Sequence, residues 1–368
     1  MASAIASLRG FIVMRALLWA ITILSCLSLT VHGVAASELV TEEFMVDAAD
    51  PGIHLYVRNK HLADMKKIPT GPLLLYVHGA TQPSEATFDL PLEGASWMDN
   101  IAAAGWDVYL MDARGYGRST GASDGAQADA GQSPVVRTDT KVQDLGSVVD
   151  FILQRRGAPK INLLGWSWGT IVTAAYAAAH GDRVSSLVLH SPVWCGGPCQ
   201  FDAGRVASLA AAHAAVGERA PFVESPPAAA RKRFQSGAPP ERIDELMPSA
   251  WFEAWSAAVL ATDPAGAKQN PPVVRIPPGV AQDFQDYWNA GLSYYDPQAI
   301  VAPTLVVVAE WDAVTPPGPA RSLFDALANS SNRRFAQIKE GTHILMLEKN
   351  RMQLFREVQQ FLDETSPM

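Results

Sequence analysis

The chain of 368 residues has few charged residues, few cysteines and no motif that binds a cofactor. It lacks a Gly-rich phosphate loop, a dinucleotide fingerprint and a cluster of metal ligands, so we predict no cofactor and no metal. Its 29 Lys and Arg residues form no basic cluster beside 37 Asp and Glu, which argues against a nucleic-acid partner. Hydrophobic residues make up 48 %, enough to bury one large core or a core with a sizeable insertion.

The first 36 residues have the pattern of an export signal. Arg9 and Arg15 supply positive charge, an apolar stretch covers 16–26, and small residues at 34–36 offer a cleavage site. We therefore expect residues 1–36 to be a signal peptide and the mature protein to be periplasmic or secreted. We expect no stable membrane span once the signal is removed, and an uncleaved membrane anchor is the alternative.

Cysteine usage agrees with export. Of the 3 cysteines, Cys26 lies in the predicted signal, which leaves Cys195 and Cys199 in the mature protein. An oxidising compartment favours a small disulfide loop between these two, and the intervening glycines and proline permit a tight turn. Two free buried thiols are the alternative.

Apolar runs and helical periodicities alternate along most of the chain. This alternation predicts an α/β fold with a mostly parallel sheet and helices on both faces. After a β-hairpin at 38–58, strands are expected at 73–77, 108–111, 161–164, 184–189, 304–309 and 335–338, and helices at 96–104, 142–153, 170–179, 319–328 and 348–362.

The pattern changes in the middle of the chain. Within 193–297 the strands vanish, and Ala-rich helical pieces separated by Pro-rich breaks replace them. We therefore expect this segment to be a helical cap, inserted into a core made of residues 37–192 and 298–368.

Ser167 has the surroundings of a catalytic nucleophile. It is the serine of a G-x-S-x-G pattern, Gly165-Trp166-Ser167-Trp168-Gly169, with a predicted strand before it and a predicted helix after it. A serine on such a sharp turn presents its hydroxyl away from the sheet. The sequence therefore predicts Ser167 as the nucleophile.

A serine nucleophile needs a base and an acid that orients the base. His343 follows the predicted strand at 335–338, and Asp312 follows the predicted strand at 304–309. These positions predict His343 as the base and Asp312 as the acid, with Glu310 and Asp202 as alternatives for the acid.

Two backbone N–H groups should stabilise the oxyanion. One is expected from Trp168, directly after the nucleophile. The other is expected from Ala80, in the loop His78-Gly79-Ala80 after the strand at 73–77. We expect the His78 side chain to hold this loop, and a second catalytic base at His78 is the alternative.

These motifs, together with the Asp112–Ser119 run Asp-Ala-Arg-Gly-Tyr-Gly-Arg-Ser, resemble the α/β-hydrolase family over nearly all of the mature region. The resemblance implies a Ser-His-Asp hydrolase with a cap over its site. It also implies that Asp112 and Arg114 belong to a structural loop. The tryptophans that flank Ser167 are similar to those of proline iminopeptidase-like members.

The aromatic residues near these motifs predict an apolar substrate pocket. Trp166, Trp194 and Trp311 are expected to line it. We therefore expect an exported serine hydrolase that acts on a small apolar or aromatic carboxylic ester or lactone. A peptidase would need an anionic group for a free amine, for which Glu253, Asp283 and Asp286 are candidates. A non-catalytic binding protein on the same fold is the other alternative.

Overall fold

The computed structural model describes residues 38–67, 72–121, 136–215 and 222–366. The predicted signal peptide at 1–36, with Cys26, lies outside these residues. Among the helices that the structure describes, none combines the length and apolar character needed to cross a bilayer.

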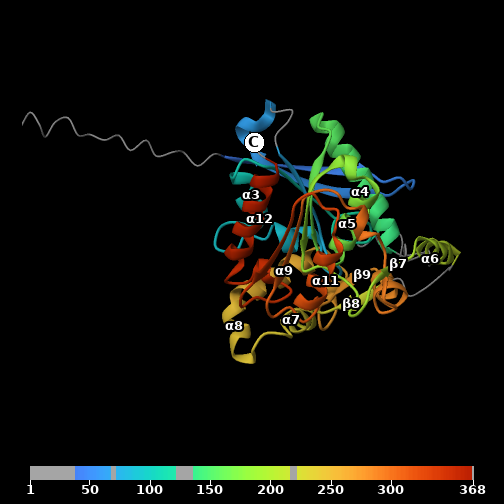
Figure 1. Cartoon of the computed structure of the whole chain (residues 1–368). Coiled ribbons are helices and arrows are strands. Elements are labelled where there is room, and N and C mark those ends of the chain that lie inside the picture. Colours follow the sequence, from blue (N-terminus) through green and yellow to red (C-terminus); the bar gives the residue numbers. More distant parts are fainter. Residues whose placement is uncertain (1–37, 68–71, 122–135, 216–221, 367–368) are drawn as a thin grey trace, which may run out of the picture. The chain divides into compact units, whose positions relative to one another are not determined.

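An eight-stranded sheet forms the centre of the fold (Figure 1). Its first two strands form an antiparallel hairpin, and the second also pairs antiparallel with the strand Asp107–Met111. All other neighbours are parallel. In spatial order the strands are β1 (Leu39–Asp47), β2 (His54–Leu62), β4 (Asp107–Met111), β3 (Leu73–Val77), β5 (Ile161–Trp166), β6 (Val184–His190), β11 (Thr304–Ala309) and β12 (Arg333–Ile338).

The central strands are apolar throughout because helices cover both faces of the sheet. Every residue of β3, β4, β5 and β11 is buried. Helices α3 (Trp97–Ala103) and α12 (Arg351–Thr365) lie on one face, and α4 (Thr138–Arg156) and α5 (Trp168–Ala179) lie on the other (Figure 1). Helix α11 (Pro317–Ala326) packs on β11 and β12. The predicted α/β architecture is therefore confirmed.

The segment between β6 and β11 contains several α-helices besides those that cover the central sheet. They are α6 (Ala203–Ala215), α7 (Pro227–Phe234), α8 (Ile243–Leu246), α9 (Ser249–Ala261) and α10 (Gly279–Asp283). The expectation that this segment has no strands was wrong. β7 (Gln200–Phe201) pairs with β10 (Leu292–Ser293), and β8 (Val223–Ser225) pairs with β9 (Val274–Ile276). Strands of two or three residues are too short to show an alternating pattern. The cap boundaries at 193 and 297 stay a prediction.

Cys195 and Cys199 form a disulfide in the structure, with 5.4 Å between their Cα atoms. The bridge closes a loop just after β6, at the start of the inserted segment. This pairing agrees with the disulfide expected from the sequence.

Candidate active site

Ser167 lies in a strained turn between β5 and α5. Its φ is 54° and its ψ is −122°, a conformation that residues with a side chain rarely adopt. The flanking glycines are required by close backbone contacts. A Cβ on Gly165 would lie 2.5 Å from the Gly169 carbonyl oxygen, and one on Gly169 would lie 2.2 Å from the Val77 carbonyl oxygen.

Three side chains from the carboxyl ends of different strands meet at this turn. The Ser167 Oγ lies 3.0 Å from Nε2 of His343, and Nδ1 of His343 lies 2.9 Å from Oδ2 of Asp312. All three side chains are buried, although Ser167 retains 8 % exposure. With a carboxylate at Nδ1, that nitrogen carries the proton, which leaves Nε2 free to accept the Ser167 hydroxyl proton.

The Asp312 carboxylate is held in its ionised form. Oδ1 accepts hydrogen bonds from the backbone N–H groups of Val314 and Thr315, and the Thr315 hydroxyl donates to Oδ2 at 2.9 Å. Burial raises the pKa of Asp312, but His343 and these donors outweigh burial, so the pKa lies below its ordinary value. The carboxylate can therefore stabilise a charged imidazole.

The other acids considered from the sequence lie elsewhere. Glu310 is exposed and accepts a hydrogen bond from the backbone N–H of Glu340. Asp202 is exposed and accepts one from the backbone N–H of Arg205. Of these carboxylates, the structure brings Asp312 to His343.

The loop after β3 lies against the nucleophile. His78 Nδ1 donates to the Gly79 carbonyl oxygen at 2.6 Å, and its Nε2 accepts from the backbone N–H of Ala113 at 3.1 Å. Lys141 Nζ donates to the His78 carbonyl oxygen at 2.6 Å. Burial lowers the pKa of His78 well below its ordinary value, so the ring is neutral and serves to hold the loop.

The two predicted oxyanion donors flank Ser167. A Cβ on Gly79 would lie 2.9 Å from the Cβ of Ser167, which places the following residue, Ala80, beside the nucleophile. Trp168 begins α5 directly after Ser167. This placement is compatible with the expected oxyanion roles, which stay a prediction.

A family model described as alpha/beta hydrolase fold matches residues 72–350. This chain belongs to the alpha/beta hydrolase fold family. Among solved structures, an esterase from Thermogutta terrifontis is 17 % identical with a TM-score of 0.58, over 88 % of this chain and 99 % of that one. The enol-lactonase from Burkholderia xenovorans LB400 is 16 % identical with a TM-score of 0.57, over 87 % of this chain and 99 % of that one. At these identities the likeness concerns the fold.

A curated relative matches this alpha/beta hydrolase over a shorter stretch. Epoxide hydrolase B from Mycobacterium tuberculosis is 28 % identical over 130 residues, which cover 34 % of this chain and 30 % of that protein. The match therefore spans about a third of either chain.

Trp166 contacts the predicted base, and its expected role in binding substrate stays a prediction. This residue is completely buried, and its indole N–H donates to the His343 carbonyl oxygen at 3.0 Å. Its ring centroid lies 5.4 Å from that of His343. This placement favours a role in positioning His343 over contact with substrate.

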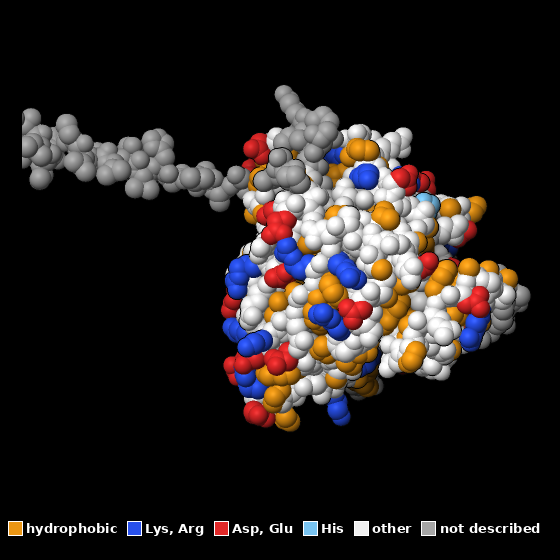
Figure 2. All heavy atoms as spheres, in the orientation of Figure 1, with side chains coloured by type: hydrophobic (Ala, Val, Ile, Leu, Met, Phe, Trp, Pro, Cys, Tyr) orange, Lys and Arg blue, Asp and Glu red, His pale blue; other side chains and the backbone are white. Residues whose placement is uncertain are grey.

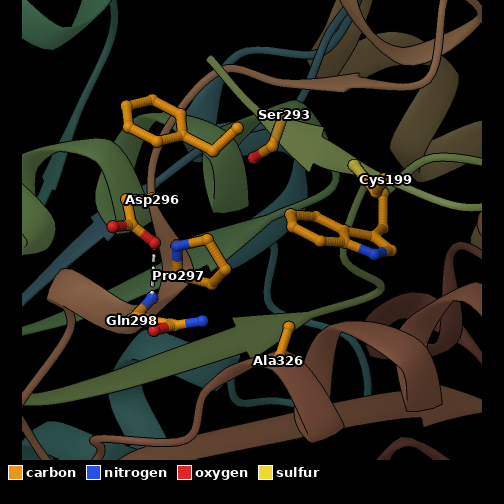
Figure 3. Close-up of a pocket in the computed structure, with 8 residues that line it drawn as sticks. Cys199, Ser293, Asp296, Pro297, Gln298 and Ala326 are labelled. Carbon is orange, nitrogen blue, oxygen red and sulfur yellow. Dashed lines mark hydrogen bonds between the residues drawn. The ribbon is translucent and has the colours of Figure 1, made fainter. Parts of the chain in front are cut away.

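Trp194 and Trp311 are the other two residues expected to line the substrate pocket. Trp194 lines a cavity of about 340 Å³ beside the disulfide (Figure 3). The lining residues Trp194, Cys199, Phe201, Ser293, Asp296, Pro297, Gln298 and Ala326 include none of Ser167, Asp312 and His343. Trp311 is half-buried, and the guanidinium of Arg242 lies 5.5 Å from its ring centroid. The contacts described for both residues therefore give no support to the expected substrate pocket.

Sequence reasoning missed several residues that support the site. The Thr315 hydroxyl donates a hydrogen bond to Asp312. Glu348 is fully buried, and its carboxylate accepts two hydrogen bonds. One comes from the Thr342 backbone N–H at 2.9 Å, and the other comes from Nε2 of Gln235 in the inserted segment at 3.1 Å. The turn 312–315, with an Asp followed three residues later by a Thr, is a signal that could have revealed Thr315.

Gly169→Ala is expected to destabilise the protein and to lower its activity. The added Cβ would press on the carbonyl oxygens of Val77 and His78, so α5 must move away from β3 and the loop after it. Overpacking of this kind costs about 1–3 kcal/mol. Gly146→Ala is the matched control, because it lies within α4 and its nearest neighbour would be at 3.8 Å. Thermal unfolding of both variants checks this, and equal stability of the two would contradict it.

Proposed function

We propose that this protein is a serine hydrolase that cleaves a carboxylic ester or lactone through an acyl-enzyme. The observation that carries the proposal is the hydrogen-bonded array of Ser167, His343 and Asp312. A serine hydroxyl becomes a competent nucleophile when an oriented base accepts its proton, and this array supplies such a base.

The proposed reaction has two steps. Ser167 Oγ attacks the ester carbonyl carbon while its proton passes to Nε2 of His343, and the backbone N–H groups of Ala80 and Trp168 receive the oxyanion. The imidazolium then donates that proton to the departing alkoxide. His343 then takes a proton from water as the water attacks the acyl-enzyme carbonyl. The bond from Ser167 Oγ to the acyl carbon breaks, Oγ receives this proton from His343, and the carboxylic acid is released.

Epoxide opening is a second candidate because of the relative named above. Attack by Ser167 on an epoxide carbon would form an ether, which has no carbonyl group for water to attack. The enzyme would then remain alkylated after one turnover. A serine at this turn therefore favours esters and lactones over epoxides.

A peptidase activity finds less support among the residues considered for binding an amine. Asp283 accepts hydrogen bonds from the Thr138 hydroxyl and backbone N–H, and both Asp283 and Asp286 lie 2.6 Å from Nη2 of Arg137. Glu253 is exposed on α9. Two of the three carboxylates are thus engaged in holding the inserted segment on α4.

A pure binding protein has no need of this arrangement. The backbone strain at Ser167 costs on the order of 1–3 kcal/mol, and a binding site would gain nothing from it. The ordered Ser167, His343 and Asp312 side chains therefore support turnover.

We infer further that the mature protein is exported, to the periplasm or beyond. The signal-like residues 1–36 and the Cys195–Cys199 disulfide support this inference. On the face shown in Figure 2, basic and acidic side chains are interspersed. That mixture gives this face no basic patch of the kind that binds nucleic acid.

The test is a substrate screen of purified mature protein beside labelling with a fluorophosphonate probe. We expect covalent labelling at Ser167, and we expect 4-nitrophenyl esters or lactones to be hydrolysed faster than aminoacyl anilides. Faster cleavage of unblocked anilides, abolished by blocking the amine, would favour the peptidase. Steady diol formation from an epoxide with an unlabelled serine would favour the epoxide hydrolase.

A further inference from the structure

Arg233 lies where the inserted segment meets the active site. It is the penultimate residue of α7, whose last residue, Phe234, contacts the base. The Phe234 carbonyl oxygen accepts a hydrogen bond from the His343 backbone N–H at 3.3 Å, and the two rings lie 5.4 Å apart. The Arg233 guanidinium lies 4.7 Å from the Phe234 ring centroid. The positively charged Arg233 is therefore the sequence neighbour of a residue that contacts His343 directly.

The same guanidinium reaches the loop that carries a predicted oxyanion donor. Nη2 of Arg233 donates to the Thr81 hydroxyl at 3.0 Å, and Thr81 directly follows Ala80. Thr81 has a φ of 71°, so its backbone is held in a conformation rarely adopted by a residue with a branched side chain. Arg233 thus joins α7 to the loop beside the nucleophile.

Arg233 has no acidic partner in the described part of the chain. No Asp or Glu oxygen there lies within 4.0 Å of its guanidinium, whereas Arg231 on the same helix pairs with Asp244 at 2.9 Å. The surrounding protein lowers the pKa of Arg233 by desolvation, although the residue as a whole remains accessible. An arginine keeps its charge in such surroundings, so an anion placed there would be stabilised.

Gln82 adds a second polar group without a full set of partners. Its side chain is fully buried, and no donor in the described structure reaches its Oε1. Its Nε2 lies 3.4 Å from the same Thr81 hydroxyl. The amide oxygen and nitrogen can exchange places by a half-turn of the side chain, which would leave an N–H donor at the unpaired position. Arg233, Thr81 and Gln82 therefore form a connected polar group beside the nucleophile.

We propose that Arg233 binds a free carboxylate of the substrate, so that the preferred substrates are esters or lactones that carry a second, ionised carboxyl group. This proposal rests on the proposed function, and it departs from the neutral, apolar substrate expected from the sequence. The planar guanidinium can receive a carboxylate through two parallel N–H donors, while the Thr81 hydroxyl completes the site. A substrate with a free amine would instead be repelled.

The test compares two pairs of esters in which a carboxylate is replaced by an uncharged isopropyl group of similar size. Ethyl hydrogen glutarate and ethyl 5-methylhexanoate differ in the acyl half. The butyrate ester of 3-hydroxypropionate and 3-methylbutyl butyrate differ in the alcohol half. Acid release in a pH-stat gives kcat/KM for each ester. We expect the anionic member of at least one pair to be the better substrate.

Arg233→Gln should lower kcat/KM for the preferred anionic ester by about tenfold to a hundredfold more than for its neutral counterpart, as expected for loss of a charge-assisted hydrogen bond, because the lost bond to Thr81 affects both esters alike. Lys232→Gln is the matched control, because this exposed neighbour on α7 carries the same charge and should change neither ester. Arg233→Lys should restore part of the loss. Preference for the neutral member of both pairs, or an equal fall for both members in Arg233→Gln, would overturn the proposal.

A binding measurement separates this proposal from the proposed function. In the Ser167→Ala protein, the Kd of each ester is measured by tryptophan fluorescence, which needs no turnover. Tighter binding of the anionic ester, lost on adding Arg233→Gln, supports the carboxylate site even where ester hydrolysis fails. Equal Kd values for the two members of both pairs overturn it even where hydrolysis is confirmed.

Discussion

Ser167→Ala is expected to abolish nearly all ester hydrolysis while leaving the protein folded. Removal of a triad serine in an unrelated hydrolase lowers kcat by about 10⁶-fold, and we expect a loss of similar order here. The change removes the hydroxyl oxygen that lies 3.0 Å from His343 Nε2. The backbone strain at position 167 stays, because alanine retains the Cβ, so the free energy of unfolding should change little.

The measurement is kcat/KM with the best ester from the screen, beside thermal unfolding. Ser208→Ala, on the exposed surface of α6, is the matched control and should match the wild type. The variant should also lose fluorophosphonate labelling. Substantial turnover in a clean Ser167→Ala preparation would show that another group is the nucleophile.

The sequence was sufficient to locate the core strands and the three central side chains. Ser167, Asp312 and His343 each follow a strand of the central sheet, and the carboxyl ends of parallel strands meet at one edge of a sheet. Chain order and apolar patterning alone therefore predict that Ser167 and His343, which are 176 positions apart, lie close together.

The sequence was a poor guide to contacts between segments that lie far apart along the chain. We expected Trp166 to line the pocket because it flanks the nucleophile. In the structure its indole N–H donates a hydrogen bond to the backbone carbonyl oxygen of His343, 177 positions away. Arg233 belongs to a run of basic residues that starts at Arg231, and no local sequence pattern distinguishes the two arginines. The contacts of both residues depend on how loops that are distant in sequence pack together. The periodicity of apolar residues along the chain carries no information about that packing.

Hydrogen bonds connect the inserted segment with the loops that carry the predicted catalytic residues. The backbone N–H of His343 donates to Phe234 on α7, and the Trp168 indole N–H donates to the Thr138 hydroxyl, which itself donates to Asp283 on α10. Burial raises the pKa of Asp283 to about 6. A substitution in the inserted segment can thus alter catalysis without touching substrate. For this reason the Arg233 test compares two esters of similar size that differ in charge.

Asp312→Asn is expected to lower kcat by about 10⁴-fold, whereas Glu310→Gln should stay within a few-fold of the wild type. The two residues lie in one loop, but only Asp312 accepts a hydrogen bond from Nδ1 of His343, at 2.9 Å. An asparagine amide can present its N–H₂ to Nδ1, which would place the ring proton on Nε2 and leave Ser167 without an acceptor. Glu310→Gln removes only the charge of an exposed acceptor of the Glu340 backbone N–H.

The comparison requires both variants to be folded, because Asp312 also accepts bonds from Val314 and Thr315. Thermal unfolding and fluorophosphonate labelling rates are therefore measured beside kcat/KM. An asparagine oxygen can still accept the two backbone bonds of this turn, so we expect a smaller loss in stability than in labelling rate. If Glu310→Gln proved the more damaging change, Glu310 would be the residue that orients the imidazole during turnover. The hydrogen bond between Asp312 and His343 would then have to be exchanged when substrate binds.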